Sequence, residues 1–104
     1  MIDICMVIST MPNRAEAEKL AAILLNKKLA ACVQIDEIQS LYMWQDELCH
    51  ANEARLVIKT LKSLYGDLRE YILEHHPYSV PQIIRIDIAE SALGYSEWIQ
   101  SILS

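Results

Sequence analysis

Two adjacent histidines and two prolines make the segment from His75 to Pro81 the clearest candidate for chemistry in this sequence. Proline disfavours the helical conformation in the residue before it, so a preceding helix is expected to end at His76. Both prolines have a fixed φ and no N–H, which makes the junction stiff. Because imidazole is a common ligand of transition metals, a corner that carries two imidazoles and the Tyr78 phenol is a candidate binding site. The alternative is a plain helix stop, with His75 on the inner face of the helix.

Candidate ligands also occur in the segments with strand character. Cys49 and His50 are adjacent, but neighbours in a strand point to opposite faces, so one site cannot easily use both. Glu53 and Lys59 have the same parity and share a face if no bulge intervenes. They are either a solvated pair or part of a cleft between chains. Cys32 lies among small residues, where a buried, inert thiol is the default.

The composition argues against several classes of protein. The chain has 104 residues and a formal net charge of −5. We therefore expect one domain over residues 1–104 and no nucleic-acid partner, since phosphate contacts need clustered Lys and Arg. No apolar run approaches the roughly 20 residues that span a bilayer, so no membrane insertion is expected. The three cysteines are odd in number and widely spaced, which favours the reducing cytoplasm over a disulfide framework.

The motifs of common enzymes are missing from the sequence. The two glycines, Gly66 and Gly94, are isolated, so no glycine-rich loop can cradle a phosphate. No zinc-type Cys-x-x-Cys pair occurs either. We therefore expect a binding protein and not an enzyme.

The hydrophobic pattern of the first half alternates between the periods of strands and helices. Residues 2–10 are nearly all apolar, which predicts a buried central strand. Asn13 is suited to cap a helix whose apolar positions continue to about Lys28. A second strand begins near Ala30. Its apolar phase slips by one residue near Asp36 and Glu37, which predicts a β-bulge or bend there.

The second half repeats the alternation. Residues 45–47 are expected to form a turn into a third strand that ends near Thr60. Ser63 can cap a second helix, whose apolar stripe ends at His75. The last strand is expected over residues 80–89. The apolar face of a C-terminal helix is formed by Tyr95, Trp98, Ile99 and Ile102.

The element order is therefore β-α-β-β-α-β plus a final helix. This order predicts an α+β protein of the ferredoxin-like type, with two helices on one face of a four-stranded antiparallel sheet. Strands of about 15 residues span about 50 Å, whereas a compact chain of this length has a diameter of roughly 34 Å. The tip of the central hairpin, which carries Tyr42, Met43 and Trp44, is expected to overhang the body and to be covered by another chain. A hairpin that bends back onto its own sheet is the alternative.

Motifs along nearly the whole chain resemble the CutA divalent-cation-tolerance family. The matching segments, in chain order, are Leu29-Ala30-Ala31-Cys32-Val33, Ser40-Leu41-Tyr42-Met43-Trp44, Glu53 with Lys59-Thr60, His76-Pro77-Tyr78-Ser79-Val80-Pro81-Gln82-Ile83 and Tyr95-Ser96-Glu97-Trp98. The order and spacing of the set, more than any one segment, carry the resemblance.

The resemblance implies a homotrimer, similar in architecture to the PII signalling proteins, that acts in tolerance or binding of divalent metal ions, copper in particular. Its implied metal ligands are His75 and His76. Ser9 stands where bacterial members often have a cysteine ligand. A hydroxyl is a poor ligand for copper, so weaker binding is expected here. The alternative function is a small-ligand sensor or a trimeric interaction scaffold.

Two further sets of residues follow from the motifs and from strand parity. The expected lining of a cleft between chains is Glu53, Lys59, Tyr78 and Cys32. The aromatic residues expected at trimer contacts are Tyr42, Trp44 and Trp98.

Overall fold

A computed structural model describes residues 2–104, and its elements follow the predicted order. These elements are β1 (Ile4–Met11), α1 (Arg14–Asn26), β2 (Cys32–Trp44), β3 (Glu47–Leu61), the 3₁₀ turn η1 (Lys62–Leu64), α2 (Tyr65–His75), β4 (Ile84–Asp87) and α3 (Leu93–Leu103). No helix among the described residues is long and apolar enough to cross a membrane.

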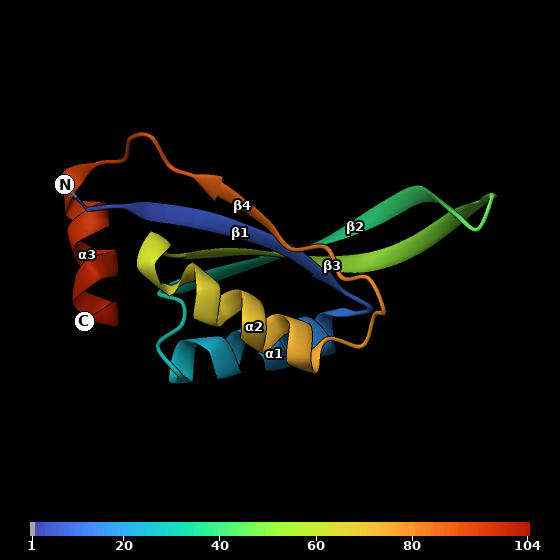
Figure 1. Cartoon of the computed structure of the whole chain (residues 1–104), viewed down its shortest axis with the longest axis horizontal. Coiled ribbons are helices and arrows are strands. Elements are labelled where there is room, and N and C mark those ends of the chain that lie inside the picture. Colours follow the sequence, from blue (N-terminus) through green and yellow to red (C-terminus); the bar gives the residue numbers. More distant parts are fainter. Residues whose placement is uncertain (1) are drawn as a thin grey trace.

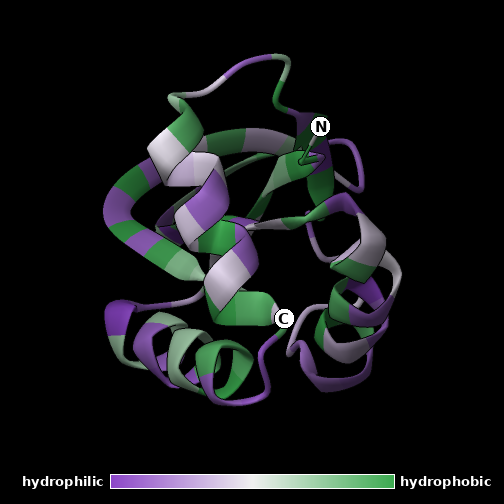
Figure 2. Cartoon of the chain, turned by 90° about the vertical axis from the view of Figure 1, so that its left-hand side faces the viewer, coloured by the Kyte–Doolittle hydropathy of each residue, from purple (hydrophilic) through white to green (hydrophobic). Residues whose placement is uncertain are grey.

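The four strands form one antiparallel sheet in the order β2-β3-β1-β4. Helices α1 and α2 lie on the same side of this sheet (Figures 1 and 2). The other side is called the open face below. This arrangement confirms the predicted ferredoxin-like α+β fold.

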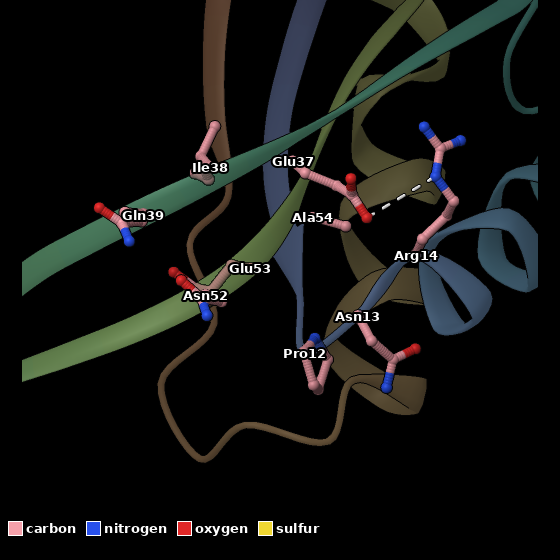
Figure 3. A pocket seen from close by; sticks show the side chains of 9 residues that line it. All are labelled: Pro12, Asn13, Arg14, Glu37, Ile38, Gln39, Asn52, Glu53 and Ala54. Carbon is pink, nitrogen blue, oxygen red and sulfur yellow. Dashed lines mark ion pairs between the residues drawn. The ribbon is translucent and has the colours of Figure 1, made fainter.

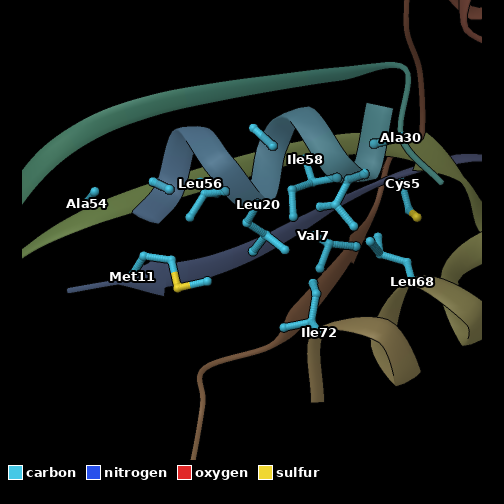
Figure 4. Close-up of a cluster of buried hydrophobic side chains, with 13 residues drawn as sticks. Cys5, Val7, Met11, Leu20, Ala30, Ala54, Leu56, Ile58, Leu68 and Ile72 are labelled. Atoms are coloured by element: carbon cyan, nitrogen blue, oxygen red, sulfur yellow. The ribbon is translucent and has the colours of Figure 1, made fainter. Parts of the chain in front are cut away.

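The main core lies between the sheet and the two helices (Figure 4). Val7 of β1 and Ile58 of β3 face each other in register and are completely buried. They contact a cluster that includes Leu24 of α1 and Ile72 of α2. The prediction that the first apolar segment is a central, buried strand is confirmed, because β1 is flanked by β3 and β4.

The two main helices begin in different ways. Asn13 caps α1 as predicted, since its Oδ1 accepts a hydrogen bond from the Glu16 N–H at 2.9 Å. Helix α1 ends at Asn26, two residues earlier than expected. The predicted Ser63 cap is wrong: Ser63 lies inside the 3₁₀ turn, and α2 begins after Leu64 with no side-chain cap. The 3₁₀ turn replaces the cap because it continues directly into the helix.

Strand β2 contains no bulge, so the bulge predicted near Asp36 and Glu37 is wrong. Its pairing with β3 is continuous from Cys32 opposite Lys59 to Trp44 opposite Glu47. Up to Ile35 the apolar side chains face the helices. Beyond this point Ile38, Tyr42 and Trp44 lie on the open face, while Leu41 and Met43 lie on the other face, where the helices no longer cover the strand (Figure 1). The slip in the apolar pattern of β2 therefore marks the point where the helices stop covering the strand, and not a change in its register with β3.

The β2–β3 hairpin overhangs the body, as predicted (Figure 1). The chain measures 45 × 26 × 22 Å. Its radius of gyration is 14.4 Å, compared with about 13 Å for a compact chain of this length. The turn contains two residues with positive φ, Gln45 at 50° and Asp46 at 66°. This left-handed pair joins the strands as a tight two-residue turn and does not bend the hairpin back.

The C-terminal part differs from the prediction in two respects. Strand β4 covers only Ile84–Asp87 of the expected residues 80–89, since Pro81 has no N–H to donate to a ladder. Of the four predicted apolar residues of α3, only Ile99 is buried. Ile99 packs against Ile4 and Leu61 at one end of the open face. The other three predicted residues, Tyr95, Trp98 and Ile102, are exposed.

Candidate functional site

Helix α2 ends at the junction that the sequence singles out. Its last residue is His75, and His76 already has an extended backbone with φ −80° and ψ 138°. Pro77 explains the change, because proline disfavours the helical conformation in the residue before it. The predicted helix stop is confirmed, and the two histidines belong to different backbone conformations.

The His76 ring is hydrogen-bonded on both sides. Its Nδ1 accepts the Tyr78 N–H at 3.0 Å, and its Nε2 lies 2.7 Å from the Thr10 carbonyl oxygen. A backbone N–H only donates and a carbonyl only accepts. The proton of the neutral ring is therefore on Nε2, which donates to Thr10. The ring is half-buried and has no nitrogen lone pair left open.

The His75 ring has different surroundings. It is exposed, and it stacks on Tyr71 with ring centroids 4.1 Å apart. The expected position on the inner helix face is therefore wrong, because the apolar stripe ends at Ile72, one turn before the helix stops. The His75 Nδ1 donates to the Tyr71 carbonyl at 3.0 Å. In the neutral ring this leaves Nε2 bare, the arrangement common in metal-binding histidines.

Tyr78 joins the junction to the base of the hairpin. Its hydroxyl donates to Glu53 Oε2 at 2.8 Å. Burial, followed by this hydrogen bond and the Glu53 charge, raises the pKa of Tyr78 well above the ordinary tyrosine value. The phenol therefore stays protonated and remains a donor over the physiological range. Two of the predicted cleft residues are thus in direct contact within one chain.

The other two cleft residues, Lys59 and Cys32, lie at the opposite end of the open face. They face each other across β3 and β2. Lys59 Nζ donates to Gln34 Oε1, so Lys59 is not the partner of Glu53. Six residues of strand separate Lys59 from Glu53, a distance of about 20 Å. The two share a face, as strand parity predicted, but one chain does not bring all four cleft residues together.

Metal binding by His75 and His76 stays a prediction, and the donors of one chain are few. Among residues 2–104, no group of three or more His, Cys, Asp or Glu side chains is placed to hold a metal ion. Ser9 is completely buried, and its Oγ has no partner in this part of the chain. Its oxygen is a harder ligand than a thiolate. The bare nitrogen of His75 is the one imidazole position at the junction that fits a metal ion.

A hollow of about 400 Å³ lies beneath the hairpin base (Figure 3). Arg14, at the start of α1, reaches over to Glu37 of β2 at 3.9 Å. The amides of Gln39 and Asn52 oppose each other across the two strands. Motif reasoning missed these polar residues. The equal strand parity of Glu37 and Gln39 was the available signal, but it marks a solvated face equally well.

The predicted aromatic contact residues are all exposed within one chain. The exposed fractions are 44% for Tyr42, 47% for Trp44 and 43% for Trp98. Tyr42 and Trp44 point to the open face near the hairpin tip, whereas Trp98 lies on α3 at the other end (Figure 1). These exposures are consistent with contacts between chains but do not define a partner.

The fold and the site define a small ferredoxin-like protein with an overhanging hairpin and a histidine–proline junction beside the hairpin base. The CutA1 divalent ion tolerance protein family matches residues 5–102. This chain belongs to that family. It is 37% identical to the divalent-cation tolerance protein CutA of Pyrococcus horikoshii, over 89% of this chain and 91% of that protein. It is 36% identical to the CutA protein of Thermus thermophilus, over 90% of its length and 92% of the relative's.

Solved structures agree with this assignment. The CutA1 crystal structure from Ehrlichia chaffeensis superimposes with a TM-score of 0.95 at 31% identity, over 100% of this chain and 98% of that one. The periplasmic CutA structure from Archaeoglobus fulgidus gives a TM-score of 0.95 at 32% identity, over 97% and 99%. The family is described by tolerance of divalent cations and not by a reaction.

Proposed function

We propose that this protein acts in divalent-cation tolerance as a homotrimer that binds the metal ion weakly, through His75. The observation that carries the assembly is an apolar surface at each end of the chain. The metal role rests on the family assignment and on the open His75 nitrogen. The names of the family and of its relatives state tolerance of divalent cations and no reaction, so we propose no catalytic step.

The hairpin tip supports assembly because both of its faces are apolar. Tyr42 and Trp44 lie on the face that continues the open face. Leu41, Met43 and Leu48 lie on the other face and are 60%, 64% and 61% exposed. A two-stranded ribbon has no core of its own, so it needs cover on both sides. An apolar surface of this kind normally marks a contact with another chain.

The second apolar surface lies on α3, at the far end of the chain from the hairpin tip (Figure 1). Leu93 is 71% exposed there, and Trp98 and Ile102 are also exposed. Two different surfaces at opposite ends favour a head-to-tail contact, which closes into a ring. Three copies follow the arrangement that the family resemblance implies. Such a ring would also bring Glu53 and Tyr78 of one copy closer to Lys59 and Cys32 of the next.

The metal role rests on the contrast between the two histidines. Only His75 combines exposure, a bare Nε2 and an Nδ1–H held by a backbone carbonyl. One imidazole gives weak binding, so a tighter site needs donors from another copy. Copper is the proposed ion because imidazole is a suitable ligand for copper, whereas magnesium and calcium prefer carboxylate oxygens. The proposed compartment is the cytoplasm, supported by three free cysteines among the described residues. Relatives include a protein named chloroplastic in Oryza sativa.

The assembly is tested by light scattering at micromolar concentration on the native protein and on Met43→Glu and Leu48→Glu. Gln39→Glu, which adds the same charge at an exposed polar position of the same hairpin, is the matched control. We expect a trimer for the native protein and the control, and dissociation for the two tip variants. A native monomer would refute the assembly.

The metal role is tested by calorimetric titration with copper and zinc of the native protein and His75→Ala. Loss of binding in His75→Ala is the expected result, and equal affinity contradicts this choice of ligand. A small-ligand sensor is the second candidate, favoured by the polar hollow beneath the hairpin base. Parallel titration with nucleotides distinguishes the two.

A further inference from the structure

We infer that His76 is a positioning residue and not a metal ligand: its ring ties segment 76–83 to the end of β1 and, through Tyr78, to Glu53 at the base of the hairpin. This inference deepens the proposed function, because it divides the roles of the two histidines at the same junction. It concerns what holds the junction in place, whether or not a metal ion binds beside it.

The tie is a continuous chain of three hydrogen bonds. The Thr10 carbonyl accepts from His76 Nε2, His76 Nδ1 accepts from the Tyr78 N–H, and the Tyr78 hydroxyl donates to Glu53. The two rings also pack against each other, with centroids 4.8 Å apart. These three bonds join β1, the segment after α2, and β3.

The segment from residue 76 to residue 83 depends on this tie. It contains no strand or helix, and regular pairing resumes only at Ile84, opposite Ile8. Its prolines supply no N–H groups for ladder bonds. Within residues 2–104, the side-chain hydrogen bonds of this segment all come from His76 and Tyr78. The His76 ring therefore takes part in two of the three side-chain hydrogen bonds that hold the segment, while Ile83, at its end, packs against the main core.

Metal coordination and the tie compete for the same nitrogens. A metal ion needs a nitrogen lone pair. The lone pair on Nδ1 is taken by the Tyr78 N–H, and Nε2 carries the proton that goes to Thr10. Coordination by His76 must therefore break one of these bonds and release one side of the segment. His75 has no such conflict, since its Nε2 is bare.

Two amide substitutions separate the roles. In His76→Asn the side-chain oxygen can still accept the Tyr78 N–H two residues on, as asparagine does in turns. In His76→Gln the side-chain NH₂ lies nearer the Nε2 position and can still donate to Thr10. His76→Ala removes both bonds. His75→Ala is the matched control, because it removes an adjacent exposed imidazole without touching the tie.

The measurements are hydrogen exchange of the Tyr78 amide by NMR, and calorimetric titration with copper and zinc. We expect exchange at Tyr78 to speed up about tenfold or more in His76→Ala. Tenfold corresponds to about 1.4 kcal/mol, the size of one net hydrogen bond. His76→Asn is expected to keep most of the protection. Metal affinity is expected to stay within about twofold of native in all three His76 variants. His75→Ala is expected to leave the exchange unchanged.

Two results would overturn the inference. One is native exchange at Tyr78 in His76→Ala. The other is loss of metal binding in the Asn, Gln and Ala variants alike. If the native protein binds neither ion, the metal part of the proposed function fails. The exchange data then decide this inference alone: faster exchange in His76→Ala supports it, and unchanged exchange overturns it.

Discussion

Replacing Ser9 by alanine should stabilise this protein. Ser9 is completely buried on the helix-covered face of β1, and its hydroxyl has no hydrogen-bond partner among residues 2–104. A buried polar group without a partner costs about 1–3 kcal/mol of desolvation. The void left by one oxygen is about 10 Å³ and costs about 0.2 kcal/mol at about 24 cal/mol per Å³. Ser9→Ala should therefore raise the free energy of unfolding by about 1 kcal/mol or more.

Thr60 provides the matched control, because it is a second fully buried hydroxyl on the same face of the sheet. Its Oγ1 donates to the Leu29 carbonyl at 2.8 Å. Thr60→Val keeps the shape of the side chain but removes this bond and leaves the carbonyl without its donor. We expect a loss of about 1–3 kcal/mol. The two substitutions should thus have opposite signs, although both remove a buried hydroxyl.

The assay is urea unfolding at one fixed protein concentration, since assembly makes stability concentration-dependent. The midpoint should move up for Ser9→Ala and down for Thr60→Val, with the slope m unchanged. If Ser9→Ala lowers the midpoint as Thr60→Val does, the Ser9 hydroxyl has a partner, such as a buried water, and the reasoning fails.

Three further predictions use other contacts. Tyr78→Phe removes the hydrogen bond to Glu53 and should lower stability by about 1 kcal/mol at neutral pH. The pKa of Tyr78 is raised in the folded state, so the native protein should lose its extra stability over Tyr78→Phe as the pH rises above about 10. A difference in stability between the two proteins that stays constant at high pH would contradict this prediction. Burial raises the pKa of the Cys5 thiol, so Cys5 should react with thiol reagents only on unfolding. Labelling of Cys5 itself in the native protein, located by mass spectrometry, would refute this. The double change Gln45→Asn and Asp46→Gly suits the positive φ of both turn residues; it should raise the urea midpoint by about 1 kcal/mol, whereas an unchanged midpoint would show that the turn is not strained.

The sequence alone was sufficient where the cause is local. The apolar run of the first strand predicted its central place in the sheet, because a central strand is apolar along most of its length. Asn13 predicted its own helix start, since a cap acts within three residues. Strand length predicted the overhang of the hairpin, and the proline after His76 predicted the helix stop.

Tertiary structure decided the features that depend on distant partners. The phase slip in β2 is ambiguous in the sequence, because a bulge and a change of cover leave the same pattern, and only the register with β3 separates them. The division of roles between His75 and His76 depends on the Thr10 carbonyl, which lies 66 residues from His76 along the chain. The partner of Glu53 is Tyr78, 25 residues away, and not the residue of matching strand parity. Residue type determines which hydrogen bonds a side chain is able to form. Which partner it meets is set by how the strands and helices pack, because a hydrogen bond forms only where packing brings donor and acceptor to within about 3 Å.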